Sequence, residues 1–187
     1  AALAAVSFIP ATNNDVNTTI TTHIEDAAGS GPADGAITLN VTPVNDPPTA
    51  TNLTDTVTYT EGDGSVALTD IVVSDVDTGE TITATLTLAN TATGSLTAGS
   101  GNGETYTAGT GVWTITGTLT AVNAALAAVA FAPATQNDVD TTITTHIEDA
   151  AGAGPADGTI MLDVTPVNDP PTATNLTNTR GYTEGAG

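Results

Sequence analysis

The feature of this sequence that most constrains its fold is an internal repeat. Residues 1–64 align without gaps with residues 124–187 at an offset of 123 positions, and only 12 of the 64 aligned positions differ. A near-identical copy at such a distance is typical of a chain built from tandem domains. The 187 residues therefore span about one and a half units of 123 residues each.

A proline-rich segment marks the boundary between successive units. Val-Asn-Asp-Pro-Pro occurs at residues 44–48 and again at residues 167–171. Two adjacent prolines restrict the chain to extended conformations, as expected of a linker between domains. The predicted parts are the C-terminal part of a preceding repeat (1–48), one complete repeat (49–171) and the first strand of a following repeat (172–187).

The differences between the two copies indicate which side chains are buried. In the strand predicted at 158–164, every second residue is unchanged and the residues between them vary. The unchanged residues are Ile160, Leu162 and Val164, and the changed ones are Thr159, Met161 and Asp163. A strand with one buried face predicts this period of two.

Alternating apolar residues predict the other strands of the complete repeat. These strands contain Val57 and Tyr59, Ile71 and Val73, Ile82 to Leu88, Trp113 to Leu119, and Ile143 to Ile147. Trp113 is interpreted as a core residue of its strand. The spacing of Val122, Leu126 and Val129 predicts one or two helical turns. About seven strands separated by turn signals predict an all-β fold, a Greek-key β-sandwich.

The charge balance excludes several classes of partner. The chain has 21 acidic residues against one basic residue, a formal net charge of −20. One basic residue cannot neutralise nucleic-acid phosphates or attract an anionic membrane surface. No apolar stretch reaches the roughly 18 residues of a membrane span, so no membrane insertion is expected. The absence of cysteine excludes disulfides, thiolate metal sites and a cysteine nucleophile.

Oxygen-bearing side chains gather in four places of the complete repeat. They are Glu61 after the first predicted strand, Asp75, Asp77 and Glu80 after the second, Asp149 at a strand end, and Asn168 with Asp169 in the linker. Taken singly, each Asp is most simply a solvated turn residue. Asp75 and Asp77 are expected on one side of an extended segment, where their carboxylates repel unless a cation lies between them. Ca²⁺ prefers such oxygen ligands.

The order of these motifs resembles the cadherin family. Cadherin-type domains carry a Glu near the end of the first strand, an Asp-x-Asp after the second, an Asp ending the sixth, and an Asn-Asp-x-Pro linker. The residues at those places here are Glu61, Asp75, Asp77, Asp149, Asn168, Asp169 and Pro170. The resemblance covers the whole 49–171 unit and is greatest to the cadherin-like repeats of giant bacterial surface adhesins, which often carry a segment like Asn123–Pro133. The Asp-Arg-Glu motif of the animal family is absent, and Pro43 and Pro166 replace the leading Asp of the linker.

This resemblance implies an Ig/cadherin-like sandwich with Ca²⁺ bound between successive repeats. The lower junction would use Asn45, Asp46, Asp75, Asp77 and Asp149, and the upper junction would use Glu61, Asn168 and Asp169. Each junction lacks part of its ligand set within these 187 residues. We therefore expect weaker Ca²⁺ binding by this chain than by one with two full repeats.

These observations predict a Ca²⁺-stabilised extender repeat of a secreted or cell-surface bacterial adhesin, with neighbouring repeats as its partners. Two alternatives stay open: a module that binds a glycan or a protein, and a spacer appended to a surface enzyme. A surface ligand could also be bound through other domains.

No enzymatic activity is expected of the repeat itself. The serines lack a His-Asp setting for a hydrolytic triad. One Trp, three Tyr and two Phe are few aromatic platforms for a sugar-cleaving cleft. His23 and His146 occupy the same repeat position and are predicted to face outward, with no second His nearby for zinc.

Overall fold

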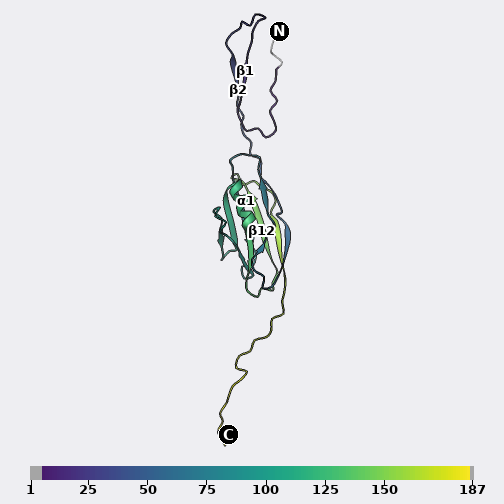
Figure 1. Ribbon diagram of the computed structural model, residues 1–187, viewed down its shortest axis with the longest axis vertical. Helices are drawn as coiled ribbons and strands as arrows, with labels where there is room; N and C mark the ends of the chain where they lie inside the picture. The colour runs from purple at the N-terminus through teal and green to yellow at the C-terminus, as the bar shows by residue number, and fades with distance from the viewer. Residues whose placement is uncertain (1–5, 186–187) are drawn as a thin grey trace.

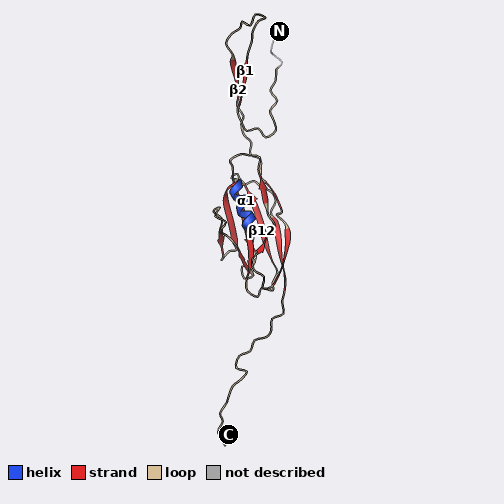
Figure 2. Ribbon diagram, viewed as in Figure 1, coloured by secondary structure: helices blue, strands red, loops and turns tan. Residues whose placement is uncertain are grey.

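The computed structural model describes residues 6–185, and its main body is a two-layer β-sandwich formed by residues 49–165 (Figure 1 and Figure 2). The elements in chain order are β1 (Thr18–Thr22), β2 (Gly35–Leu39), β3 (Thr49–Thr51), β4 (Asp55–Thr60), β5 (Val66–Ala67), β6 (Val72–Ser74), β7 (Thr81–Leu88), β8 (Gly94–Leu96), β9 (Thr105–Thr107), β10 (Val112–Thr118), α1 (Leu119–Ala128), β11 (Ala130–Pro133), β12 (Thr141–Glu148) and β13 (Gly158–Thr165). The predicted all-β sandwich is confirmed.

One layer is a six-stranded sheet with the order β4-β13-β12-β7-β10-β9. Its neighbouring strands are antiparallel except β4 and β13, which run parallel. The first and last long strands of the unit therefore lie side by side. In β7 the residues Ile82, Ala84, Leu86 and Leu88 are all buried, as the alternation predicts.

The facing layer combines the sheet β5-β11-β8, the pair β3-β6 and the helix α1. Thr118 caps the helix, because its side chain accepts a hydrogen bond from the N–H of Ala121 at 3.3 Å. The predicted strand 113–119 is therefore one residue too long, since Leu119 begins the helix. No helix within residues 6–185 has the length and apolar character that a membrane span requires.

The core lies between the two layers and is centred on Trp113 and Phe131, both fully buried. The ring of Phe131 packs edge-on against Tyr59 with 5.6 Å between ring centroids. In β13 the unchanged apolar residues Ile160, Leu162 and Val164 are at most 6% exposed, whereas Met161 is 48% exposed. The burial predicted from the two copies is confirmed in this strand.

The hairpin β1–β2 repeats the local structure of β12–β13. Ile20 pairs with Ile37, and at the equivalent positions Ile143 pairs with Ile160. In Figure 1 the hairpin lies beyond one end of the sandwich, and the C-terminal segment 166–185 leaves from the other end. The division into successive repeats stays a prediction from the sequence.

Candidate metal centre

Three acidic side chains converge in the turn between β6 and β7. Asp75, Asp77 and Glu80 each place one carboxylate oxygen within 4.8 Å of the others. The Asp75 carboxylate accepts a hydrogen bond from the N–H of Asp77 at 2.9 Å, and Gly79 adopts a φ of +84° that returns the chain toward the sheet. The expectation of an extended segment here is wrong, because the Asp75 side chain folds it into a turn that brings Glu80 back to both aspartates.

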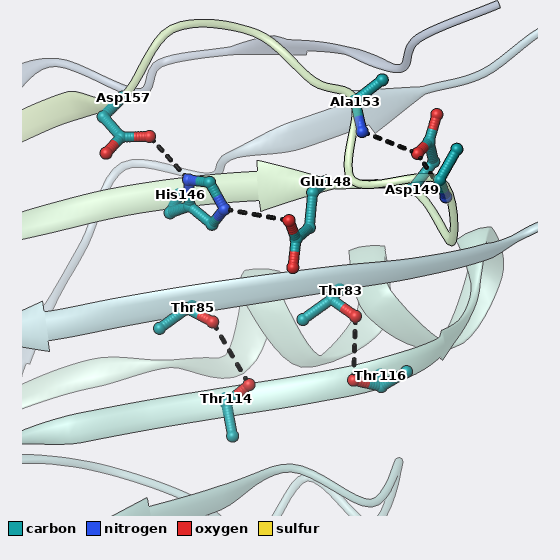
Figure 3. Close-up of polar contacts among 10 residues, drawn as sticks. Thr83, Thr85, Thr114, Thr116, His146, Glu148, Asp149, Ala153 and Asp157 are labelled. Carbon is teal, nitrogen blue, oxygen red and sulfur yellow. Dashed lines mark hydrogen bonds and ion pairs between the residues drawn. The ribbon is translucent and has the colours of Figure 1, made fainter.

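Asp149 approaches this turn from the end of β12. Its side chain is 3% exposed and organises the following loop, since one oxygen accepts hydrogen bonds from the N–H groups of Ala151 and Ala153 at 2.8 Å each (Figure 3). The other oxygen accepts a hydrogen bond from Nδ2 of Asn45 at 2.8 Å. The Asn45 amide, followed by the loop N–H groups, lowers the pKa of Asp149, which favours its ionised form.

The linker is attached to the same place through its backbone. The N–H of Asp46 donates a hydrogen bond to Oδ2 of Asp77 at 2.7 Å. Together with the Asn45–Asp149 bond, this contact holds the linker against the turn. The structure thus brings together all five residues predicted for the lower junction: Asn45, Asp46, Asp75, Asp77 and Asp149.

Two further carboxylates belong to the cluster but were not among the predicted ligands. Burial raises the pKa of Glu80, and the nearby charges of Asp75, Asp77 and Asp149 raise it further. Asp15 comes from the segment before β1. Its pKa is raised mainly by desolvation, and further by the nearby carboxylates of Asp77 and Asp46. A signal for Asp15 exists in the repeat, because its equivalent Asp138 precedes the last hairpin as Asp15 precedes the first.

The cluster contains carboxylate oxygens that no protein group compensates. Oδ2 of Asp75 and Oε2 of Glu80 are buried and have no hydrogen-bond partner. Burying a carboxylate oxygen without a partner costs free energy. Among residues 6–185 there is one Lys or Arg, Arg180, and it lies in the exposed C-terminal segment. A groove of about 460 Å³ lies beside these side chains, and its lining includes Asp15, Asn45, Asp77 and Glu80. These residues fit a hard divalent cation with oxygen ligands.

The residues predicted for the upper junction lie at the opposite end of the sandwich. Oε2 of Glu61 accepts a hydrogen bond from the N–H of Val167 at 2.8 Å, and Nε2 of Gln136 donates one to Oδ2 of Asp169 at 3.0 Å. Asn168 is exposed. Glu61 therefore holds the linker that leaves the sandwich. The structure separates the predicted ligands into a lower-junction group and an upper-junction group, as the sequence analysis did.

His146 lies on the outer face of the six-stranded sheet (Figure 3). Its Nδ1 is 2.6 Å from Asp157 and its Nε2 is 3.4 Å from Glu148. Asp157 is the main cause that raises the pKa of His146. Both ring nitrogens thus face carboxylates, and the prediction of an outward-facing histidine is confirmed.

No known protein family model matches this chain, and no curated protein is similar to it in sequence.

Proposed function

We propose that this chain is a structural extender that binds Ca²⁺ where residues 1–48 meet the sandwich 49–171. Binding would fix the direction of one unit relative to the next. In a tandem array outside a bacterial cell, such junctions would hold a distal adhesive domain away from the surface. The role is mechanical, and the partners are the neighbouring repeats of the same chain.

The observation that carries this proposal is the convergence of carboxylates from separate parts of the chain. The turn 75–80, the end of β12, the linker 43–48 and Asp15 contribute to one cluster. Because Asp75 Oδ2 and Glu80 Oε2 are buried without partners, the cluster is poorly compensated by protein groups alone. A divalent cation would supply the missing positive charge.

The protein's own groups would transmit this binding to the linker. Asp77 and Asp149 already hold the backbone of Asp46 and the side chain of Asn45. Asp15 is the one carboxylate of the cluster that belongs to the segment before the linker. Relief of the repulsion between Asp15 and the aspartates of the sandwich would therefore stiffen the connection between the two parts.

Calorimetric Ca²⁺ titration of the full chain tests the site directly. We expect binding with a Kd of about 10⁻⁴ to 10⁻³ M, the range of extracellular modules, and at least a tenfold weakening in a variant with both Asp75→Asn and Asp77→Asn. Asp163→Asn is the matched control, because Asp163 lies on the outward face of β13. Equal affinity in the double variant and the control would refute the site.

The mechanical role needs a separate measurement. Small-angle scattering of the full chain, and of a chain with two complete repeats, is expected to give a longer and narrower distance distribution with Ca²⁺ than with EDTA. We also expect the two-repeat chain to bind Ca²⁺ more tightly for each junction. If Ca²⁺ binds but the distance distribution is unchanged, the Ca²⁺ site is supported and the proposed stiffening is contradicted.

A further inference from the structure

The loop 98–104, between β8 and β9, contains Asn102-Gly103, the one Asn-Gly pair of the sequence. Every other asparagine of the chain is followed by a residue that has a side chain. Asparagine is among the chemically labile residues of proteins. Glycine leaves the backbone nitrogen that follows it unshielded, because glycine has no Cβ. None of the residues of the proposed Ca²⁺ site lies in this loop.

Both residues of the pair are exposed to water. Gly103 has a φ of +99°, and apart from its chain neighbours no heavy atom lies within 4 Å of the place where a Cβ would stand. Within residues 6–185, the N–H of Gly103 has no protein acceptor. Exposed loop tips with small and polar residues are also where the chain moves most freely. The backbone nitrogen of Gly103 is therefore accessible and unrestrained.

The carboxamide of Asn102 is held against its own loop. Its Nδ2 donates a hydrogen bond to Oγ of Ser100 at 2.8 Å. Short polar side chains commonly bind nearby groups of a turn in this way. Covalent geometry places Cγ of an asparagine where a bond to the next backbone nitrogen closes a five-membered ring. The electrophile and the nucleophile of such a ring closure are thus both present in this loop.

The related pair Asp157-Gly158, at the start of β13, shows how the fold blocks the same ring closure. The N–H of Gly158 donates a hydrogen bond to Oγ1 of Thr145 at 3.2 Å, and Gly158 is buried. A Cβ at Gly158 would collide with the backbone carbonyl of Leu53. The Asp157 carboxylate lies 2.6 Å from Nδ1 of His146. Nucleophile and electrophile are both restrained there, in contrast to the loop 98–104.

We propose that Asn102 is a site of spontaneous deamidation in the folded protein. The backbone nitrogen of Gly103 attacks Cγ of Asn102, the bond from Cγ to Nδ2 breaks, and ammonia leaves with the proton of the Gly103 N–H. Water then opens the cyclic imide at either of its carbonyl groups. Opening at Cγ gives aspartate, and opening at the main-chain carbonyl gives isoaspartate, in which the backbone is longer by one carbon. Water is the only co-reactant.

The modification falls where the loop binds the carboxylate of Glu104. The N–H groups of Gly99 and Ser100 donate to Oε1, the first of them at 2.7 Å, and the N–H of Asn102 donates to Oε2 at 3.2 Å. Desolvation raises the pKa of Glu104, but hydrogen bonds from the Ser100 side chain and from the backbone outweigh it and lower the pKa to about 2. Isoaspartate changes the path of the backbone and adds a negative charge beside Glu104. We therefore expect the hydrogen bonds to Glu104 to weaken and its pKa to rise.

The first experiment incubates the folded full chain for weeks at neutral and at mildly alkaline pH. Peptide mapping by mass spectrometry that separates aspartate from isoaspartate follows each asparagine. We expect Asn102 to react first and to give both products, at a rate that rises with hydroxide concentration because the attacking nitrogen must lose its proton. Asn90, which is exposed and followed by Thr91, is the internal control. Equal conversion of Asn102 and Asn90, or conversion of neither, would overturn the proposal.

The same measurement in urea tests whether the fold leaves the site open. Unfolding is expected to change the rate at Asn102 by no more than a few-fold. Isoaspartate formation at Asp157 should become detectable only in urea, because Gly158 then loses its hydrogen bond and its burial. An increase at Asn102 as large as that at Asp157 would show that the folded loop protects the pair, and would contradict the proposal.

A third measurement tests the effect on the loop. The isoaspartate form is isolated by chromatography, and the pKa of Glu104 is measured by NMR titration. We expect a value clearly above the value of about 2 in the unmodified loop. Asn102→Asp is the matched control, because it adds the charge without lengthening the backbone, and it should raise the pKa less. An unchanged pKa in the isoaspartate form would contradict the expected rearrangement. None of these experiments needs Ca²⁺, so their results are independent of the proposed metal site.

Discussion

At the scale of single residues, small polar side chains join segments that are far apart in the sequence. Asn123 of α1 accepts a hydrogen bond from the N–H of Val73 at 2.8 Å and donates one to the carbonyl of Val73 at 2.9 Å. The buried Oγ1 of Thr145 donates to the carbonyl of Leu53 at 2.9 Å. These contacts satisfy backbone groups of the short strand β6 and of the bend between β3 and β4, which have few ladder partners of their own.

Replacing Asn123 is expected to weaken the join between the helix and β6. Asn123→Ala leaves both backbone groups of Val73 without their side-chain partner, at a cost of about 1–3 kcal/mol in the free energy of unfolding. Urea unfolding measures the difference. Asn102→Ala, in the exposed loop before β9, serves as the control, and an equal loss there would show that the Asn123 contacts contribute nothing specific.

The pH dependence of stability is expected to contain a contribution from His146. Asp157 raises the pKa of His146 above 6.5, so the contact contributes fully below about pH 6.5 and is lost as pH rises through the higher folded-state pKa. The melting temperature of the parent chain relative to that of His146→Gln should therefore fall as the pH rises above about 6.5. A difference that is independent of pH would contradict this assignment.

At the scale of elements, the long strands follow the alternation of apolar residues and the short ones do not. β7, β12 and β13 each have eight residues, enough for a period of two to be visible in the sequence. β5 has two residues and β9 has three, so neither carries a periodic signal. The end of β10 was misplaced because the Thr118 cap, and not hydrophobicity, determines where the helix begins.

Neighbouring residues of β13 offer a matched test of which face is buried. Ile160 is fully buried and Met161 is 48% exposed. Ile160→Ala is expected to reduce the free energy of unfolding by about 2–5 kcal/mol, because it leaves a cavity in the core. Met161→Ala should change it by no more than about 0.5 kcal/mol. Denaturant unfolding of the two variants measures both effects. A larger loss in Met161→Ala than in Ile160→Ala would show that the strand register is wrong.

At the scale of the whole molecule, the two ends of the chain differ in how well their apolar residues are covered. Ile160 and Ile147 are buried in the sandwich, whereas their equivalents Ile37 and Ile24 are 51% and 56% exposed. The hairpin has one strand pair and no facing layer within the described residues. Two isolated strands are marginally stable in water.

A chain of residues 49–171 is therefore expected to fold without the flanking segments. It should unfold in a single cooperative transition, with a melting temperature in EDTA close to that of the sandwich in the full chain. A chain of residues 1–48 should show no cooperative transition. Circular dichroism measures both, and loss of folding in 49–171 would show that the linker contacts are required for the sandwich itself.

The sequence by itself determined the sandwich class, the buried face of each long strand and the members of the two oxygen-rich groups. These properties follow from local periodicity and from the comparison of two aligned copies. Only the tertiary structure decided that Glu80 and Asp15 join Asp75 and Asp77. Their proximity depends on the turn at Gly79 and on the path of the linker, which are set by contacts between distant segments and leave no periodic pattern in the sequence.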